Sequence, residues 1–261
     1  MLGILGGMGP LATAAFYRKL VERTPADADQ RHLPVVVWAD PGVPDRSAAL
    51  LGEGPSPLPA LVEGARELRR AGASCIAVPC NTAHAYVEQV TRVTGVEVVD
   101  MIEAALGRAA HSAQDVRRVG VLATRGTRAA GLYERAGARL GLTVVQVPDE
   151  AQRSYVDPAI RAVKAGADTA GAARRIASAT GVLKEQGAQV VVAACTEIPL
   201  VAGEAARVLP MVDSAEALAD RVLDLMWRPS REAFVTGYGN GRVISYPRTD
   251  AQERTGPSLR R

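Results

Sequence analysis

The sequence predicts an α/β protein made of two similar doubly wound parallel-sheet domains. Short apolar runs of strand length alternate with longer stretches of helical periodicity, a pattern typical of parallel sheets covered by helices on both faces. A series of motifs in the first part of the chain recurs in the second part. Apolar residues make up 48% of the chain and aromatic residues only 4%, which suits helices packed closely on a sheet better than a β-sandwich.

The expected strands are short and continuously apolar. The first covers residues 2–5 and leads into a helix from Leu11 to about Arg23, with Pro10 at its start, where proline is tolerated. Further strands are expected at residues 35–38, 75–78, 119–123, 143–147 and 190–194, and further helices at residues 58–71 and 83–93 and between the later strands. Strands and helices that alternate in this way define the doubly wound α/β class.

An internal repeat relates the two halves of the chain. Three segments recur in the same order at nearly the same spacing: residues 71–82 match 186–197, residues 3–7 match 120–124, and residues 99–104 match 212–217. The first of these matches has no gap and aligns Cys80 with Cys195 at an offset of 115 residues. A single duplication indicates two similar domains, because a solenoid needs more copies.

We expect the first domain to comprise residues 1–100 and 210–227, and the second to comprise residues 101–209. The tail, residues 228–261, is rich in Gly, Pro, Arg and Ser and is expected to be partly disordered. Two such domains pack about a pseudo-twofold axis, with the carboxyl ends of their strands toward a shared cleft that holds the active site. Cys80 and Cys195 each follow a strand at equivalent positions, so their thiols are expected to meet across this cleft.

Charge and composition exclude several classes of function. The formal net charge is only +3, and no basic stripe interleaved with aromatic residues indicates nucleic-acid binding. No apolar run is long enough for a membrane span, and the first residues lack the basic region of a signal peptide. Three cysteines without an export signal are typical of reduced thiols in the cytoplasm. The expected partner is a small molecule, neither nucleic acid nor membrane.

Three interpretations compete for Cys80 and Cys195. Buried cysteine is a common small apolar residue, and Cys75, inside an apolar strand, is assigned that structural role. A metal site is disfavoured because the cysteines do not have the clustered spacing that metal ligands require. The third interpretation is catalysis, since polar residues follow each thiol and the expected helix N-terminus there favours an anion, either thiolate or substrate carboxylate.

The equivalence of the two thiols favours one type of reaction. A hydrolase or transferase needs a nucleophile and a different base, whereas racemisation has two directions that are mirror images. One thiolate removes the α-proton, and the opposite thiol delivers a proton to the other face of the carbon. The hydroxyls and amides that follow each cysteine would hold the α-carboxylate and stabilise the carbanion.

Several motifs together resemble the aspartate racemase branch of the aspartate/glutamate/hydantoin racemase superfamily. The motifs are Gly3-Ile4-Leu5-Gly6-Gly7-Met8-Gly9-Pro10, Val43-Pro44-Asp45-Arg46, Pro79-Cys80-Asn81-Thr82-Ala83-His84 and Cys195-Thr196-Glu197. The resemblance covers about residues 2–227. It implies a pseudo-symmetric two-domain fold, a homodimer, no metal or organic cofactor, and Cys80 and Cys195 as paired catalytic bases.

The same resemblance suggests the substrate-binding residues. It implies that the α-carboxylate is bound by Asn81, Thr82, Thr124 and Thr196. It also implies that Arg46 and Lys164 bind the side-chain carboxylate. Met8 and Glu197 are further candidate substrate-binding residues, and Glu197 either orients Cys195, binds the substrate ammonium or only complements a helix dipole.

The identity of the substrate and two other functions remain open from the sequence. Ile160 stands where the family commonly has tyrosine, and Gly42 lies in a stretch where it tends to have Asn and Gln. Aspartate is therefore the first candidate substrate, glutamate the second, and a less common acidic or polar amino acid follows. The alternatives are a cysteine-dependent dicarboxylate isomerase of the maleate isomerase type and a non-catalytic ligand-binding homologue.

Overall fold

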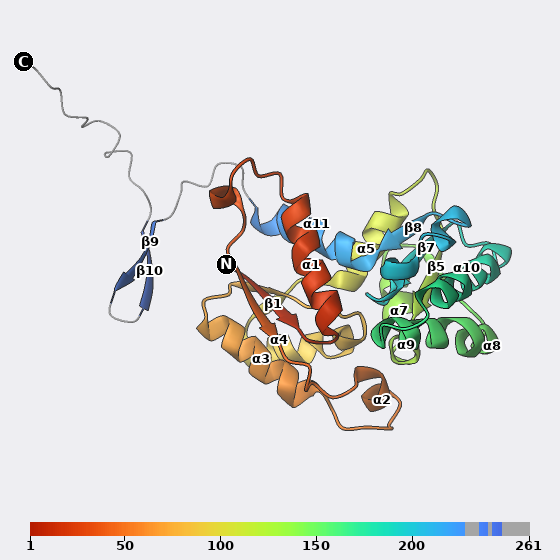
Figure 1. The fold of residues 1–261 in the computed structure, drawn as a ribbon, viewed down its shortest axis with the longest axis horizontal. Helices are drawn as coiled ribbons and strands as arrows, with labels where there is room; N and C mark the ends of the chain where they lie inside the picture. Colours follow the sequence, from red (N-terminus) through yellow and green to blue (C-terminus); the bar gives the residue numbers. More distant parts are fainter. Residues whose placement is uncertain (228–234, 240–241, 247–261) are drawn as a thin grey trace, which may run out of the picture.

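A computed structural model describes residues 1–227, 235–239 and 242–246 of the chain (Figure 1). Its strands are β1 (Leu2–Gly6), β2 (Val35–Ala39), β3 (Cys75–Ala77), β4 (Glu97–Val98), β5 (Arg118–Ala123), β6 (Thr143–Gln146), β7 (Val190–Ala194), β8 (Met211–Asp213), β9 (Val235–Gly239) and β10 (Arg242–Tyr246). All the strands expected from the sequence are present. Strands β4 and β8, of two and three residues, were not predicted.

The helices lie between the strands. The α-helices are α1 (Pro10–Arg23), α2 (Arg46–Leu50), α3 (Leu58–Arg70), α4 (Val87–Thr94), α5 (Met101–Ala110), α6 (Arg125–Ala129), α7 (Leu132–Arg139), α8 (Asp149–Ala151), α9 (Asp157–Lys164), α10 (Thr169–Glu185) and α11 (Ser214–Met226). Single turns of 3-10 helix are η1 (Asp29–Arg31), η2 (Thr82–Ala85), η4 (Ile198–Val201) and η5 (Ala205–Arg207), and η3 (Gln152–Val156) is a π-helical turn. The helix expected at residues 83–93 is divided into η2 and α4.

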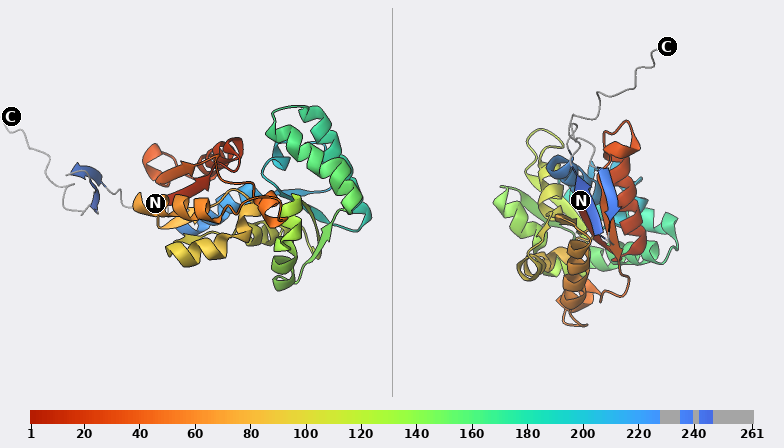
Figure 2. Two further views of the ribbon diagram at one scale, coloured as in Figure 1. Left: turned by 90° about the horizontal axis from the view of Figure 1, so that it is seen from below. Right: turned by 90° about the vertical axis from the view of Figure 1, so that its left-hand side faces the viewer.

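Each half of the chain contains a four-stranded parallel sheet with the same connectivity. The strand orders are β2-β1-β3-β4 and β6-β5-β7-β8. The registers also correspond, since Gly3 pairs with Ile76 in the first sheet and Gly120 pairs with Val191 in the second. Figures 1 and 2 show the two halves side by side. The structure thus confirms the predicted fold class and the internal repeat.

Helices α5 and α11 exchange between the halves. Helix α5 follows a strand of the first sheet, but its Leu106 packs with Val121 of the second sheet. Helix α11 follows a strand of the second sheet, but its Leu218 packs with Ile4 of the first. Each half therefore completes its core with a helix that the other half supplies. Strand β8 lies in the second sheet and α11 packs on the first; the division of the chain into two domains remains a prediction.

The two exchanged helices begin with the same cap. Asp100 Oδ1 accepts hydrogen bonds from the backbone N–H groups of Ile102 and Glu103, at 2.8 and 3.0 Å. Asp213 Oδ1 accepts from the N–H of Ala215, the second residue of α11, at 2.8 Å. Aspartate is a preferred N-cap because its carboxylate satisfies amides that have no partner inside the helix. The repeated Val-Asp motif thus sets the start of both helices.

The C-terminal segment is described only in part. Strands β9 and β10 pair antiparallel, with Val235 opposite Tyr246. The predicted partial disorder of the tail falls on residues 228–261, and it lies outside the described residues apart from the backbone of these two strands. No helix in the described part of the chain is long and apolar enough to cross a membrane.

Buried hydrogen bonds join the Cys80 loop to the second half. The hydroxyl of Tyr133, on α7, donates to Asn81 Oδ1 at 2.6 Å. Asn81 Nδ2 donates to Ser214 Oγ at 3.0 Å, and Ser214 in turn donates to the carbonyl of Ala193 at 2.8 Å. These side chains are all buried, so each bond satisfies a group that water does not reach.

Removal of the Tyr133 hydroxyl should therefore destabilise the protein. In Tyr133→Phe the buried Asn81 Oδ1 loses its hydrogen-bond donor, which should lower the free energy of unfolding by about 1–3 kcal/mol. Tyr17→Phe is a matched control, because Tyr17 is exposed, and it should change stability by less than about 0.5 kcal/mol. Urea unfolding followed by circular dichroism measures both. Equal midpoints for the two variants would contradict this role of Tyr133.

Candidate active site

All ten site residues named from the sequence lie around one small cavity between the halves. The first half contributes Met8, Asp45, Arg46, Ser47, Cys80, Asn81 and Thr82, and the second contributes Thr124, Lys164, Cys195, Thr196 and Glu197. Asp45 and Ser47 were not predicted. The structure brings the predicted residues together, and their individual roles remain predictions.

Cys80 lies in a tight turn after strand β3. Its backbone N–H donates to the carbonyl of Val78 at 2.7 Å, and its side chain is buried. His84 Nδ1 donates to the Cys80 carbonyl at 2.9 Å, while Nε2 accepts from the N–H of Met101 at 3.1 Å. Burial lowers the pKa of His84, so the neutral ring is favoured. His84 therefore ties the Cys80 turn to the start of α5.

Cys195 follows strand β7 directly and is also buried. Its thiol donates to Glu197 Oε2, with 3.0 Å between the sulfur and the oxygen, and the Thr196 hydroxyl donates to the same oxygen at 3.3 Å. Burial, followed by the charge of Glu197, raises the pKa of the Cys195 thiol well above its usual value, whereas Lys164 acts in the opposite direction. The surroundings of Cys195 favour the protonated thiol.

This result corrects one expectation from the sequence. We expected a helix N-terminus after each cysteine to favour an anion, either a thiolate or a substrate carboxylate. The segments that follow Cys80 and Cys195 are the single 3-10 turns η2 and η4, which align few peptide dipoles. Glu197 also places a negative charge beside Cys195. For a thiolate at Cys195 the expectation is therefore wrong.

Hydroxyl groups from both halves meet at the cavity: Ser47, Thr82 and Thr124 line it, and the buried Thr127 bonds to the two threonines. Thr82 Oγ1 lies 3.0 Å from Thr124 Oγ1 and 2.9 Å from Thr127 Oγ1, and Ser47 donates to Thr124 Oγ1 at 3.2 Å. Thr127 was missed by the sequence analysis along with Ser47. The available signal was the cap of α6, in which the Thr127 N–H donates to Thr124 Oγ1. Hydroxyls that both donate and accept suit the binding of a carboxylate.

The two cations of the site differ in how their charge is balanced. Arg46 Nη1 donates to the carbonyls of Val43 and Pro44, both at 3.1 Å, and Nη2 donates to the carbonyl of Met8 at 3.2 Å. Arg46 Nε is buried without a hydrogen-bond partner, and the guanidinium forms no ion pair within residues 1–227. Lys164 Nζ, in contrast, lies 3.5 Å from a carboxylate oxygen of Glu197. Arg46 is therefore the cation of the cavity that has no ion-pair partner in this part of the chain, although the acidic residue Asp45 also lines the cavity.

The cavity is small in this structure. Its volume is about 30 Å³, enough for a water molecule but not for an amino acid. Helix α2 from the first half covers it and contacts α6 of the second half. Binding of an amino acid therefore requires the walls of the cavity to separate.

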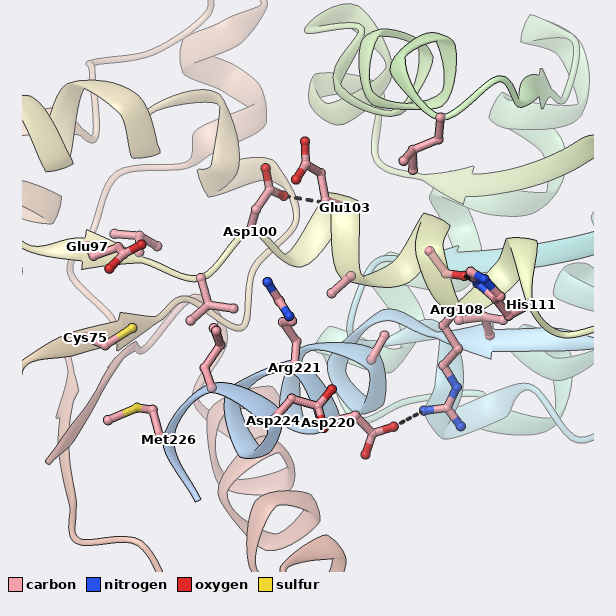
Figure 3. Close-up of a pocket in the computed structure, with 18 of the residues that line it drawn as sticks. Cys75, Glu97, Asp100, Glu103, Arg108, His111, Asp220, Arg221, Asp224 and Met226 are labelled. Atoms are coloured by element: carbon pink, nitrogen blue, oxygen red, sulfur yellow. Dashed lines mark hydrogen bonds and ion pairs between the residues drawn. The ribbon is translucent and has the colours of Figure 1, made fainter. Parts of the chain in front are cut away.

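A larger hollow lies elsewhere, between helices α5 and α11 (Figure 3). Its volume is about 1570 Å³, and neither Cys80 nor Cys195 lines it. Charged side chains along it pair with one another, for example Arg108 Nη1 with Asp220 Oδ2 at 2.8 Å. Cys75 lies at one end, where burial and, to a lesser extent, the charge of Glu97 raise the pKa of its thiol. This hollow is therefore not the candidate active site, because it does not contain the two thiols Cys80 and Cys195.

Two similar parallel-sheet halves with a thiol from each at a shared cavity define a class of isomerases. A profile described as "Asp/Glu/Hydantoin racemase" matches residues 5–222. The chain therefore belongs to the Asp/Glu/hydantoin racemase family, and it is an amino-acid racemase by that membership.

Individual relatives agree with this assignment. The broad specificity amino-acid racemase RacX of Bacillus subtilis is 25% identical over 228 residues, which cover 84% of this chain and 95% of RacX. The structure of Picrophilus torridus aspartate racemase superposes with a TM-score of 0.75 at 30% identity, and the match covers 86% of this chain and 93% of that one. A putative Asp/Glu racemase from Yersinia pestis shares the fold, with a TM-score of 0.70 at 22% identity over 86% and 97% of the chains.

Gly126 allows α2 to approach α6 over the cavity. A Cβ atom at this position would lie 2.5 Å from Ser47 Cα, whereas a Cβ at Gly181 in α10 would meet nothing within 4 Å. Gly126→Ala should lower the thermal unfolding midpoint, because backbone in α2 must move. Gly181→Ala should raise stability by up to about 1 kcal/mol through helix propensity alone. Calorimetry compares the two, and a gain at both positions would refute the close contact.

Proposed function

We propose that this chain is a cofactor-independent amino-acid racemase that transfers a proton between the two faces of the α-carbon with Cys80 and Cys195. The observation that carries the proposal is that one thiol from each half of the repeat lines the same small cavity. Two equivalent groups on opposite sides of one carbon suit a reaction whose directions are mirror images.

In the proposed mechanism the active enzyme carries one proton on the pair of thiols before substrate binds. The Cys80 thiolate takes the α-proton of one enantiomer, and the Cys195 thiol delivers its proton to the opposite face of the carbanion. Cys80 is then the thiol and Cys195 the thiolate, and the other enantiomer reacts by the reverse path. The hydroxyls of Thr82, Thr124 and Thr196 would hold the α-carboxylate, into which the charge of the carbanion delocalises.

The preferred substrate is proposed to be an acidic amino acid, aspartate first and glutamate second. A second substrate carboxylate inside the cavity needs a paired cation, and the unpaired Arg46 guanidinium supplies one. Lys164 would add a second, weaker contact because Glu197 already balances its charge. Similarity to the Picrophilus torridus aspartate racemase supports the choice of aspartate, while similarity to RacX keeps a wider range of amino acids open.

Asn81 and Met8 support the other residues of the proposed site. Both ends of the Asn81 amide are already hydrogen-bonded to Tyr133 and Ser214, so its main contribution is to position the Cys80 loop. The carbonyl of Met8 accepts from Arg46 and orients that side chain.

We further propose a cytoplasmic homodimer with two domains per subunit, residues 1–100 with 210–227 and residues 101–209. The resemblance to the aspartate racemase branch supports the dimer. Free thiols at Cys75, Cys80 and Cys195 support a reducing compartment. Light scattering of the purified protein gives its mass in solution and tests the dimer.

Each catalytic thiol should be required for racemisation but not for every proton exchange. Cys80→Ala and Cys195→Ala should both abolish racemisation of aspartate. Each variant should still exchange the α-proton of one enantiomer with solvent deuterium, and the two variants should act on opposite enantiomers, because one base remains on one face. Proton NMR in deuterium oxide measures the exchange. Cys75→Ala is the control and should racemise normally; racemisation at the normal rate by either of the other variants would end the two-thiol mechanism.

Arg46 should determine the preference for an acidic side chain. Arg46→Ala should reduce kcat/KM for aspartate and glutamate on the order of 100-fold, because it leaves a buried carboxylate without its cation. Activity on alanine or serine, if present, should change much less. Arg18→Ala serves as the control, since Arg18 is exposed and pairs with Glu22 along α1. An equal loss on acidic and neutral amino acids would contradict the proposed specificity.

A further inference from the structure

Glu197 distinguishes the two halves of the candidate active site. The offset of 115 residues that aligns Cys195 with Cys80 aligns Glu197 with Thr82. The repeat therefore places a carboxylate two residues after one thiol and a hydroxyl two residues after the other. The resulting contacts also differ, because Thr82 bonds to the hydroxyls of Thr124 and Thr127.

The Glu197 carboxylate is buried and holds Cys195 at close range. Oε2 accepts from the Cys195 thiol at 3.0 Å, and Oε1 lies 3.5 Å from Lys164 Nζ. Only 6% of Glu197 is exposed, so little solvent screens its charge. Within residues 1–227 no hydrogen bond joins the Cys80 thiol to a carboxylate.

The other ionisable groups around Cys195 do not cancel this effect. Lys164 from α9 opposes it but is itself paired with Glu197. Tyr133 from α7 stays neutral, because burial raises the pKa of its hydroxyl well above the usual value. Arg46 from α2, Asp45 at the start of α2, and Cys80 complete the set of ionisable groups around the cavity, all three from the first half.

We infer that Glu197 makes the two thiols unequal by holding the proton on Cys195, so that the free enzyme presents Cys80 as the base and Cys195 as the acid. The inference rests on the proposed racemase function and assigns the protonation state in which its cycle begins. Glu197 is a positioning residue in this scheme, since it acts through Cys195 and takes no proton from substrate.

The difference in protonation between the two thiols does not favour one enantiomer as the product. Two enantiomers have equal free energies, so kcat/KM must be the same in both directions at every pH. The effect of Glu197 should instead lie in the pH profile. The active form carries one proton on the pair of thiols, and it is lost at high pH when Cys195 gives up that proton. By raising the pKa of Cys195, Glu197 extends activity to higher pH.

Glu197→Gln tests this inference, because the amide has the shape of the carboxylate but no charge. The basic limb of kcat/KM should move to lower pH by at least about one unit, equally for both enantiomers. Initial rates of alkylation by iodoacetamide, measured for each cysteine by mass spectrometry across the pH range, give a readout that needs no turnover. In Glu197→Gln the midpoint for Cys195 should fall below its value in the unmodified enzyme.

Two further variants complete the test: one should shift the Cys195 midpoint in the opposite direction, and the other is a control. Lys164→Gln should move the alkylation midpoint of Cys195 to higher pH, because Lys164 lowers the pKa of that thiol. Glu204→Gln makes the same chemical change at an exposed position and should move neither midpoint. An unchanged Cys195 midpoint in Glu197→Gln would overturn the inference and leave Glu197 as a substrate ligand. If the Cys195 midpoint falls in Glu197→Gln but the unmodified protein racemises no amino acid, the inference is supported and the proposed function is refuted.

Discussion

The exchange of helices α5 and α11 is the constraint on which the rest of the structure depends. Each sheet would expose an apolar face without the helix that the other half supplies, so neither half completes its core alone. The contacts that hold the Cys80 loop begin at these same helices. His84 accepts from the first amide of α5, and Asn81 donates to Ser214 at the start of α11. The packing of both cores and the position of Cys80 therefore depend on the exchange of these two helices.

A duplicated scaffold here supports a site that is not symmetric. Proton transfer between two faces of a carbon calls for two similar thiols, and the repeat supplies them at equivalent positions. Recognition of the remaining substituents calls for different groups on different sides, because an amino acid has one side chain and one ammonium. Arg46, Lys164 and Glu197 are proposed to meet that need. Arg46 and Lys164 lie outside the three repeated segments, and Glu197 stands where the first half has Thr82. The repeat thus provides the symmetry, and residues that differ between the halves provide the asymmetry.

Charge balance in the cavity connects recognition with chemistry. Glu197 is shared between a thiol and Lys164, which leaves Arg46 as the cation without an anionic partner in the described chain. A substrate carboxylate would complete the balance. The same arrangement keeps a proton on one thiol before substrate arrives. Burial strengthens the interaction between Cys195 and Glu197, because little solvent screens it, whereas the Lys164 side chain is 41% exposed.

The sequence by itself determined the α/β class, the duplication and the pair of cysteines, because the alternation of strands and helices and the fixed offset of the repeat can be read from the order of residues alone. It also named ten of the residues that gather at the cavity, through the motifs around the two cysteines and the family resemblance. Only the tertiary structure decided the exchange of α5 and α11, the additional hydroxyls of Ser47 and Thr127, and the contact between the Cys195 thiol and Glu197. These features depend on distances between segments far apart in the chain, such as Lys164 and Glu197, and on burial, which sets the strength of a charge interaction. No periodicity or motif encodes either quantity.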